Sequence, residues 1–254
     1  MRIVRLAVPG EPFGLVEGDS VHLLSTAPWL GGSPNGQVVP FDPAQLLAPV
    51  TPSKVVAIGR NYAAHARELG HDVPSEPLLF LKAPSSIVGP NAPIRVPSVS
   101  ARVEHEAELA LVIGKRCKRV AEAQALEYVY GWTVLDDVTA RDLQKKDVQF
   151  TRAKSFDTFC PIGPWIETEL DPADLEVSAR VDGVYKQRGR TRNMIFPVPM
   201  LISYVSCMMT LEPGDVITTG TPEGVGPLLP GNLLETEVEG IGVLRNPIIA
   251  DDES

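Results

Sequence analysis

Proline and glycine recur so often along this chain that only short regular elements fit between them. The 254 residues include 24 prolines and 21 glycines, spread over the whole length. Proline fixes its φ angle and lacks a backbone N–H, and glycine favours turns, so both interrupt helices and central strands. The segments between them are mostly short and apolar, which is typical of strands. We therefore predict an α+β fold that is predominantly β-sheet.

The first 50 residues are predicted to form a small β-rich domain. Short apolar segments near residues 3–8, 15–16 and 21–24 are separated by turn-forming residues, a pattern that predicts small hairpins. Residues 31–52 carry prolines and glycines at close intervals, so we expect no regular structure there. We place a domain boundary near residue 50, followed by a larger domain over residues 51–254.

The larger domain is predicted to contain mostly strands and a few helices. Apolar runs predict buried strands at residues 54–59, 109–113 and 132–135. At residues 234–238 buried-type residues alternate with glutamates, which predicts a strand with one wet face. Helices are predicted at residues 61–69, 139–146 and 200–211, with Thr139 as the N-cap of the second.

Composition and charge exclude several classes of protein. The chain is 44% hydrophobic, without an apolar run approaching the roughly 18 residues of a membrane span, and its start lacks a secretory signal pattern. We therefore expect a cytoplasmic location. The net charge of −9 repels phosphate groups, so nucleic acid is not an expected partner. Three well-separated cysteines, Cys117, Cys160 and Cys207, are expected to be reduced thiols in the core.

A pair of glutamates marks the start of one predicted strand. Side chains of a strand point alternately to opposite faces, so Glu106 and Glu108 share a face, whereas apolar residues occupy the other. A divalent cation relieves the repulsion between two such carboxylates, whose oxygens suit Mg²⁺, Mn²⁺ or Ca²⁺. The alternative is an acidic strand end exposed to solvent, which the pair alone does not exclude.

A second acidic pair lies between the strand at 132–135 and the helix at 139–146. Asp136 or Asp137 stands at that junction and is a candidate third ligand. Acidic residues before a helix also serve as caps, which is the alternative interpretation. The periodicity does not choose between the two aspartates.

Several sequence blocks in order resemble the fumarylacetoacetate hydrolase family over roughly residues 53–248. The resemblance implies a mixed β-sandwich roll, a homodimer, bound Mg²⁺ or Mn²⁺, and the metal ligands Glu106, Glu108 and Asp137. The first fifty residues resemble the small N-terminal domain of bacterial members. The blocks that carry the resemblance are Ile58-Gly59-Arg60-Asn61-Tyr62 with His65, Leu79-Phe80-Leu81-Lys82, His105-Glu106-Ala107-Glu108-Leu109, Asp137-Val138-Thr139-Ala140-Arg141-Asp142, Ala153-Lys154-Ser155-Phe156, Gln187-Arg188-Gly189-Arg190-Thr191, Met194-Ile195-Phe196 and Thr219-Gly220-Thr221-Pro222.

The resemblance also implies the catalytic residues His65, Glu68 and Lys154. His65 and Glu68 are three residues apart, so the carboxylate can orient the imidazole as a general base. By spacing alone the two would be interpreted as a surface pair. In related proteins the corresponding dyad lies on a lid, which here would span residues 62–76. Lys154 aligns with the family's active-site lysine, and a surface lysine is the alternative.

Three further residues are expected to bind substrate. Arg141 and Gln144 are three residues apart on the predicted helix, so both can face the metal pocket and hold a carboxylate. Thr221 lies in a turn that offers a hydroxyl and backbone donors for the same purpose. The glycines of this turn lack the Gly-Lys-Ser/Thr pattern of a phosphate loop, so a nucleotide site is not expected.

The resemblance implies action on 2-oxo or 2-hydroxy-enoic dicarboxylic acids through a metal-stabilised enolate. Three reactions share that chemistry: isomerisation of 2-hydroxyhepta-2,4-diene-1,7-dioate in aromatic-acid catabolism, decarboxylation or tautomerisation of oxaloacetate, and hydrolysis of acylpyruvates at a C–C bond. We favour the bacterial isomerase and decarboxylase branch because the length and short N-terminal domain are similar to it. A catalytically silent metal-binding module is the alternative from another class, although it would not need His65, Glu68, Arg141, Gln144 and Lys154 together.

Overall fold

Strands provide most of the regular structure in the computed structural model, which describes residues 1–251. The predicted α+β, predominantly β class is therefore confirmed. The helices are α1 (Ala63–Glu68), α2 (Arg141–Lys146), α3 (Thr151–Lys154) and α4 (Val198–Met208). The strands are β1 (Arg2–Arg5), β2 (Phe13–Glu17), β3 (Ser20–Leu24), β4 (Pro34–Pro40), β5 (Val55–Gly59), β6 (Leu78–Lys82), β7 (Ile87–Val88), β8 (Ile94–Val96), β9 (Val103–His105), β10 (Ala107–Ile113), β11 (Val129–Asp136), β12 (Thr139–Ala140), β13 (Cys160–Glu167), β14 (Glu176–Val181), β15 (Val184–Arg190), β16 (Val216–Thr218), β17 (Gly226–Pro227), β18 (Leu233–Val238) and β19 (Gly242–Ala250).

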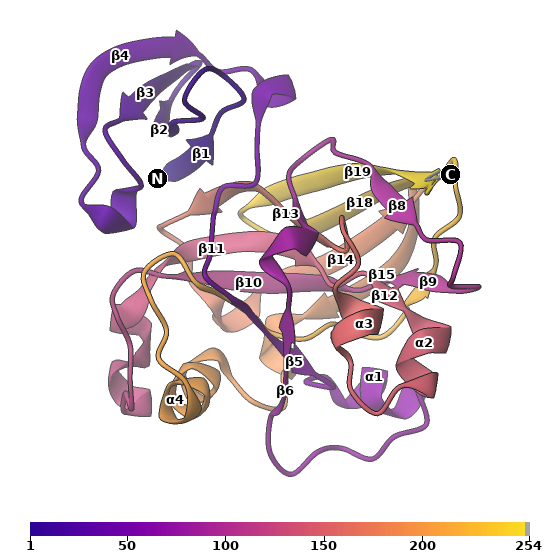
Figure 1. The fold of residues 1–254 in the computed structure, drawn as a ribbon. Helices are drawn as coiled ribbons and strands as arrows, with labels where there is room; N and C mark the ends of the chain where they lie inside the picture. Colours follow the sequence, from indigo (N-terminus) through magenta and orange to yellow (C-terminus); the bar gives the residue numbers. More distant parts are fainter. Residues whose placement is uncertain (252–254) are drawn as a thin grey trace.

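A large mixed sheet and a smaller sheet pack face to face. The large sheet has the order β4-β3-β2-β1-β13-β11-β10-β16-β5-β6, and the smaller has the order β15-β14-β18-β19-β8. A short sheet, β12-β9-β17, joins their ends. Figure 1 shows β10 and β11 running through the middle of the molecule beside β14 and β18. The layers form the mixed sandwich that the sequence resemblance implies.

Strand β10 is buried on both faces, because sheet layers and helices cover it from each side. Leu109 and Leu111 belong to the main core between the two sheets, together with side chains of β14, β18 and α4. Ala110 and Val112 belong to a second core on the other face, which also contains residues of β13 and β16. Since apolar side chains fill both faces, the position of β10 is strongly determined by burial.

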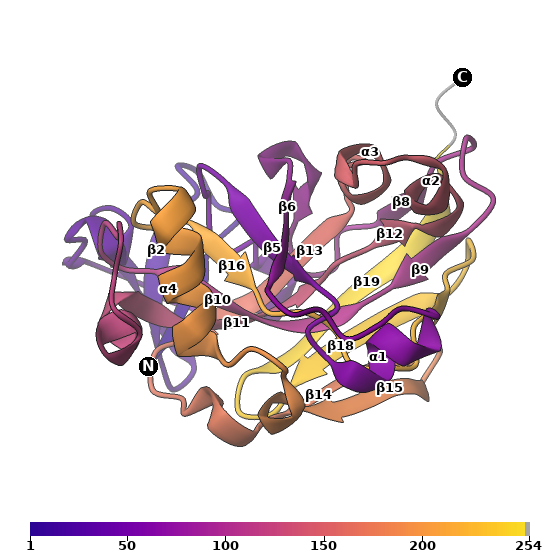
Figure 2. The ribbon, with the colours of Figure 1, turned by 90° about the horizontal axis from the view of Figure 1, so that it is seen from below.

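The helices gather at two ends of the large sheet. Figure 2 shows α4 at one end and α1, α2 and α3 at the other, near β9 and β12. Helix α2 begins later than predicted, because Thr139 belongs to β12. Its Oγ1 donates to the backbone oxygen of Asp137 at 2.8 Å, so Thr139 is not the N-cap. Within residues 1–251, no helix is long and apolar enough to cross a membrane.

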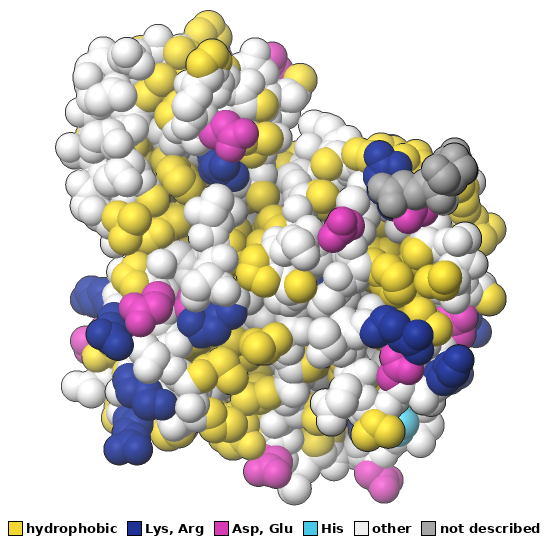
Figure 3. All heavy atoms as spheres, viewed as in Figure 1, with side chains coloured by type: hydrophobic (Ala, Val, Ile, Leu, Met, Phe, Trp, Pro, Cys, Tyr) yellow, Lys and Arg dark blue, Asp and Glu magenta, His cyan; other side chains and the backbone are white. Residues whose placement is uncertain are grey.

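The N-terminal strands form a lobe that continues the large sheet. Strand β1 pairs antiparallel with β13, and β1 to β4 follow as successive hairpin neighbours. The lobe stands apart from the rest of the surface behind a notch (Figure 3). The expectation of no regular structure over residues 31–52 is wrong, because β4 pairs with β3. Pro34 and Pro40 are tolerated since β4 is the edge strand and they lie at its ends. The boundary near residue 50 stays a prediction.

The cysteines correspond only partly to the expectation of core thiols. All three are free, and Cys117 and Cys160 are buried. Cys207 is exposed instead, because it lies on the side of α4 that faces away from the core, beside the exposed Met208.

The buried side chain of Asn61 joins three segments beneath the start of α1. Its Nδ2 donates to the backbone oxygens of Phe196 at 3.0 Å and Thr219 at 2.8 Å. Its Oδ1 accepts from the backbone N–H of Phe196 at 2.8 Å. Because these groups are buried away from water, they depend on the Asn61 amide for their hydrogen bonds.

We predict that Asn61→Ala lowers the free energy of unfolding by about 3 kcal/mol, since it leaves buried backbone groups without partners. Urea unfolding followed by circular dichroism measures the change. The matched control is Asn193→Ala, at an exposed position, which is expected to leave stability within about 0.5 kcal/mol. Equal stability of the two variants would contradict the role assigned to Asn61.

Candidate active site

The pairing of β10 with β11 determines which acidic side chains meet. Ala107 lies opposite Asp136 in the antiparallel register, so Glu106 and Asp137 face each other one step beyond the end of the paired strands. The backbone N–H of Asp137 donates to the carbonyl oxygen of Glu106 at 2.8 Å. Residues that oppose each other across an antiparallel pair project to the same face. The Asp137 carboxylate therefore joins Glu106 and Glu108, which share that face.

Asp136 has a different environment. Its Oδ1 accepts from the backbone N–H of Glu106 at 2.9 Å, and its Oδ2 accepts from Thr236 Oγ1 on β18 at 2.8 Å. Asp136 thus stabilises the turn that carries Glu106 and lies on the opposite face from the acidic triad. The register supplies a physical reason for Asp137 as the third candidate ligand.

The triad Glu106, Glu108 and Asp137 is a compact buried cluster. One ligand oxygen from each residue lies within 4.8 Å of the others, and the exposed fractions are 4%, 1% and 1%. An acidic strand end in solvent, the alternative for Glu106 and Glu108, does not describe these residues. Buried carboxylates require compensating charge or hydrogen bonds.

Two buried lysines supply much of that compensation. Lys154, the last residue of α3, donates to Glu106 Oε2 at 2.8 Å and to Asp137 Oδ2 at 2.6 Å. Lys82, the last residue of β6, donates to Asp137 Oδ1 at 2.6 Å and to the backbone oxygen of Lys154 at 2.5 Å. Burial lowers the pKa of Lys154, but Asp137 and Glu106 outweigh burial and raise it overall. Lys154 is therefore a cation inside the site, not a surface lysine.

Arg141 orients Glu106 from the other side. Its guanidinium forms an ion pair with Glu106 Oε1, its Nε donates to Glu104 Oε2 at 2.6 Å, and its Nη1 donates to Gln144 Oε1 at 2.6 Å. Burial raises the pKa of Glu106, but the charges of Lys154 and Arg141 outweigh burial and hold it well below its usual range. Glu106 is consequently ionised whenever the protein is folded near neutral pH.

Glu108 is more buried than Glu106, and the groups that act on its pKa are different. Its Oε2 accepts from Thr218 Oγ1 and, at 2.7 Å, from the backbone N–H of Gly220. Burial raises the pKa of Glu108, and the negative charge of Asp137 raises it further. The lysines therefore leave part of the repulsion at Glu108 uncompensated.

The donor set fits a divalent cation. Three carboxylates offer hard oxygen ligands from two adjacent strand ends, which suits Mg²⁺ or Mn²⁺ better than metals that prefer sulfur or imidazole. The Oε2 atom of Glu108 accepts both of these hydrogen bonds, from Thr218 and Gly220. Neither of them occupies Oε1, the other carboxylate oxygen. A cation beside Glu108 would also relieve the repulsion that raises its pKa.

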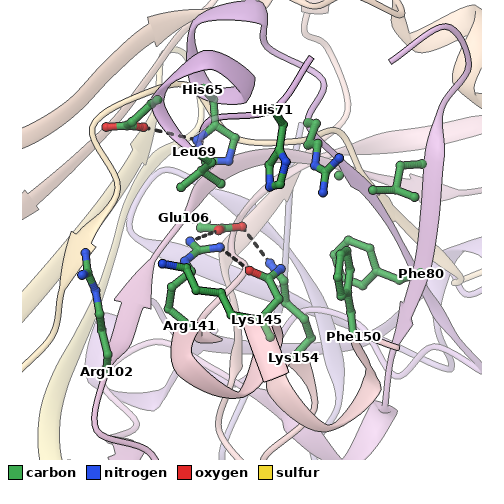
Figure 4. A pocket seen from close by; sticks show the side chains of 15 residues that line it. His65, Leu69, His71, Phe80, Arg102, Glu106, Arg141, Lys145, Phe150 and Lys154 are labelled. Atoms are coloured by element: carbon green, nitrogen blue, oxygen red, sulfur yellow. Dashed lines mark hydrogen bonds and ion pairs between the residues drawn. The ribbon is translucent and has the colours of Figure 1, made fainter. Parts of the chain in front are cut away.

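A cavity of about 480 Å³ opens onto this cluster. Figure 4 shows His65, Leu69 and His71 on one side, and Arg141, Lys145 and Lys154 on the other. Phe80 and Phe150 pack edge to face, with ring centroids 5.6 Å apart, and form an apolar wall. The lining residues are Gly59, Arg60, His65, Glu68, Leu69, His71, Leu78, Phe80, Arg102, Glu106, Arg141, Gln144, Lys145, Phe150 and Lys154.

The structure brings most of the candidate site residues to this cavity. His65 is buried in its wall, 3.4 Å from Glu68 (Nδ1 to Oε2), and Glu68 also accepts from the backbone N–H of Gly224 at 3.1 Å. The surface-pair interpretation of His65 and Glu68 does not describe this arrangement. Glu108 and Asp137 lie behind Glu106 and Lys154 and do not line the cavity. The roles of all these residues stay predictions.

Thr221 lies elsewhere. Its hydroxyl donates to the backbone oxygen of Ala107 at 2.8 Å and accepts from Gln187 Nε2 at 2.7 Å. These bonds tie the turn after β16 to the start of β10 and to β15, and Thr221 does not line the cavity. A direct contact between its hydroxyl and substrate stays a prediction.

Sequence reasoning missed Lys82 and Glu104. Lys82 is the last residue of the Leu79-Phe80-Leu81-Lys82 block that carries the resemblance. A lysine at the end of an apolar strand also indicates a buried ion pair, since buried lysines need a partner. Glu104 has the same strand parity as Glu106, and it binds Arg141 and Arg102. Arg102 is two residues from Glu104, but Asp137 is far in sequence from Lys82 and Arg141 is far from Glu104, so only the fold identifies these two buried pairs.

Comparisons with known proteins find two family models that match this chain. The family model described as Fumarylacetoacetate (FAA) hydrolase C-terminal matches residues 54–249, and the one described as Rv2993c-like, N-terminal matches residues 1–49. The structure of 2-hydroxyhepta-2,4-diene-1,7-dioate isomerase from Mycobacterium marinum is similar over 100% of both chains, with 44% identity and a TM-score of 0.91.

Two further relatives carry the names of other reactions. The mitochondrial oxaloacetate decarboxylase of Dictyostelium discoideum is 46% identical over 198 residues, 75% of this chain and 91% of the relative. The structure of fumarylpyruvate hydrolase from Pseudomonas aeruginosa, in complex with Mn²⁺ and pyruvate, is 35% identical with a TM-score of 0.76. The similarity covers 82% of this chain and 92% of that one.

We predict that binding of Mg²⁺ or Mn²⁺ releases protons, and that affinity rises with pH through the range in which Glu108 titrates. Burial and the charge of Asp137 raise the pKa of Glu108 and so favour its protonated form in the free protein, whereas a cation binds its carboxylate form. Titration calorimetry in buffers of different ionisation enthalpy measures the released protons.

Two variants complete this test. Glu108→Gln is expected to abolish proton release and weaken binding, whereas the control Glu127→Gln, at an exposed position, is expected to leave both unchanged. Binding without proton release in the wild-type protein would show that Glu108 is not the titrating ligand.

Proposed function

The chain belongs to the fumarylacetoacetate hydrolase family, and on that premise we propose that it is a Mg²⁺- or Mn²⁺-dependent isomerase of 2-hydroxy-enoic (2-oxo) dicarboxylic acids. Its substrates would be of the 2-hydroxyhepta-2,4-diene-1,7-dioate type. The observation that carries the proposal is the position of His65. This buried imidazole lines the same cavity as Glu106, Arg141 and Lys154, and Glu68 is its partner.

The cationic side chains of the cavity favour a carboxylate at its inner end. Arg141 donates a hydrogen bond to Gln144, and both side chains line the cavity. The two residues can therefore hold the substrate carboxylate together. A divalent cation at the triad supplies positive charge beside that carboxylate and the 2-oxo oxygen, and so stabilises the charge that develops there. The Lys154 ammonium adds a second positive charge on the same side.

His65 is placed to move the proton. Isomerisation takes a proton from one carbon and returns a proton to another, so it requires a base that reaches the carbon skeleton. If Nδ1 of His65 donates to Glu68, the other ring nitrogen, Nε2, is left as the acceptor. The apolar wall of Phe80 and Phe150 excludes water beside the conjugated chain and disfavours hydrolysis.

Decarboxylation of oxaloacetate is the second candidate. It requires charge stabilisation at the 2-oxo oxygen and no base, and Lys154 with Arg141 supplies cations for it. The name of the Dictyostelium relative supports this candidate, as that of the Pseudomonas relative supports hydrolysis of acylpyruvates. The silent-module alternative gains no support from a cavity lined by a histidine, an arginine and a lysine. A homodimer and a cytoplasmic location stay predictions.

The decisive experiment is a panel of 2-hydroxyhepta-2,4-diene-1,7-dioate, oxaloacetate and acetylpyruvate with Mg²⁺ or Mn²⁺, followed by ultraviolet absorbance. We predict that the dienedioate is the preferred substrate. His65→Ala is expected to lower its kcat by about 10²–10⁴-fold, the usual contribution of a general base. Oxaloacetate decarboxylation, if present, is expected to change far less.

The control is His22→Ala, since His22 lies on β3 in the N-terminal lobe, far from the cavity in the fold. It is expected to retain full activity on every substrate. A wild-type protein that is inert toward all three compounds would refute the proposed function, and undiminished isomerisation by His65→Ala would refute the role of His65.

A further inference from the structure

The cavity carries more positive than negative charge. Its lining includes three cations that already have carboxylate partners. Lys154 is paired with Glu106 and Asp137, and Arg141 is paired with Glu104 and Glu106. Arg102 is likewise paired with Glu104, at 2.5 Å. The charge of each of these three cations is therefore at least partly compensated.

Arg60 and Lys145 are the other two cationic residues of the cavity lining. Within residues 1–251, no salt bridge or side-chain hydrogen bond engages either of them, although both line the cavity. They come from different elements, since Arg60 follows β5 and Lys145 lies on α2. Two cations without partners on one cavity create a local surplus of positive charge that favours an anion.

The backbone at Arg60 has an uncommon conformation that nearby hydrogen bonds hold in place. Arg60 has a φ of 56°, in the left-handed region that residues with a side chain seldom adopt. The next residue, Asn61, is held by its three hydrogen bonds to Phe196 and Thr219, which fixes the chain just after Arg60. Strained backbone that is held by its surroundings is common where a side chain must be positioned for binding.

His71 reports the same positive potential. Partial burial lowers its pKa, and the charges of Arg60 and His65 lower it further, whereas only Asp72 opposes them. Figure 4 shows His71 pointing into the cavity from the side of α1, opposite Lys145. Arg60 therefore contributes positive charge on the side of the cavity that carries His71.

We propose that Arg60 and Lys145 bind the distal carboxylate of a 2-oxo dicarboxylic acid whose first carboxylate lies beside Arg141 and the acidic triad. The inference rests on the proposed function and adds the residues that select a diacid over a monoacid. Leu78, Phe80 and Phe150 line the same cavity and offer apolar contacts for the carbon chain. A substrate with an anion at each end and an apolar middle matches this combination of cationic and apolar side chains.

Binding of two matched acids to the Mg²⁺-loaded protein tests the proposal. 2-Oxoheptanedioate and 2-oxoheptanoate have the same length and differ only in the distal carboxylate. Titration calorimetry is expected to show that the wild-type protein binds the diacid at least tenfold more tightly. Arg60→Gln and Lys145→Gln are each expected to reduce that preference several-fold, and the double variant is expected to remove it.

The control is Lys146→Gln, the neighbouring exposed lysine of α2, which does not line the cavity and is expected to keep the full preference. Unchanged binding of 2-oxoheptanoate to the variants shows that they are folded. A preference that persists in the double variant, or equal binding of both acids by the wild-type protein, overturns the inference and leaves the proposed function standing. If neither acid binds the wild-type protein with Mg²⁺, the proposed function fails as well.

Discussion

The site depends on a row of alternating charges that the fold buries except at its outer end, where Arg102 is exposed. Arg102, Glu104, Arg141, Glu106, Lys154, Asp137 and Lys82 follow one another, each paired with the next. Removing ions from water costs several kcal/mol each, and the cost is offset only when partners are held in good geometry. Strands β6, β9, β10 and β11 and helices α2 and α3 must all be in place before the row is complete. The protein therefore cannot assemble its site locally, and the two sheets that enclose β10 are a condition for the chemistry.

Much of the fold and part of the site could be predicted from the sequence. The parity of residues along β10 grouped Glu106 with Glu108, because the side-chain period of a strand is independent of its partners. The choice of Asp137 over Asp136 needed the resemblance, since it depends on the register of β10 against β11. The structure explains that choice by placing Ala107 opposite Asp136. Register is a non-local property, and no periodicity within one strand contains it.

The errors have the same origin. Prolines over residues 31–52 argued against a strand, but β4 is an edge strand, where a missing N–H breaks no ladder bond. Thr139 was expected to cap a helix, whereas pairing with Glu104 places it in β12. Lys82 and Glu104 escaped notice because their buried partners, Asp137 and Arg141, lie far away in sequence. In each case a tertiary neighbour overrode a local preference.

A hydrogen bond joins the loop after β16 to helix α1. The backbone N–H of Gly224 donates to Glu68, so the loop after β16 holds the residue that orients His65 on α1. If α1 moved away from the cavity, Glu68 would lose Gly224 and the imidazole would leave the space above Glu106. On the proposed function, the helix that covers the cavity would also carry the base. On that function, the base would reach a substrate only while α1 covers the cavity, and reactive intermediates would then be kept out of contact with bulk water.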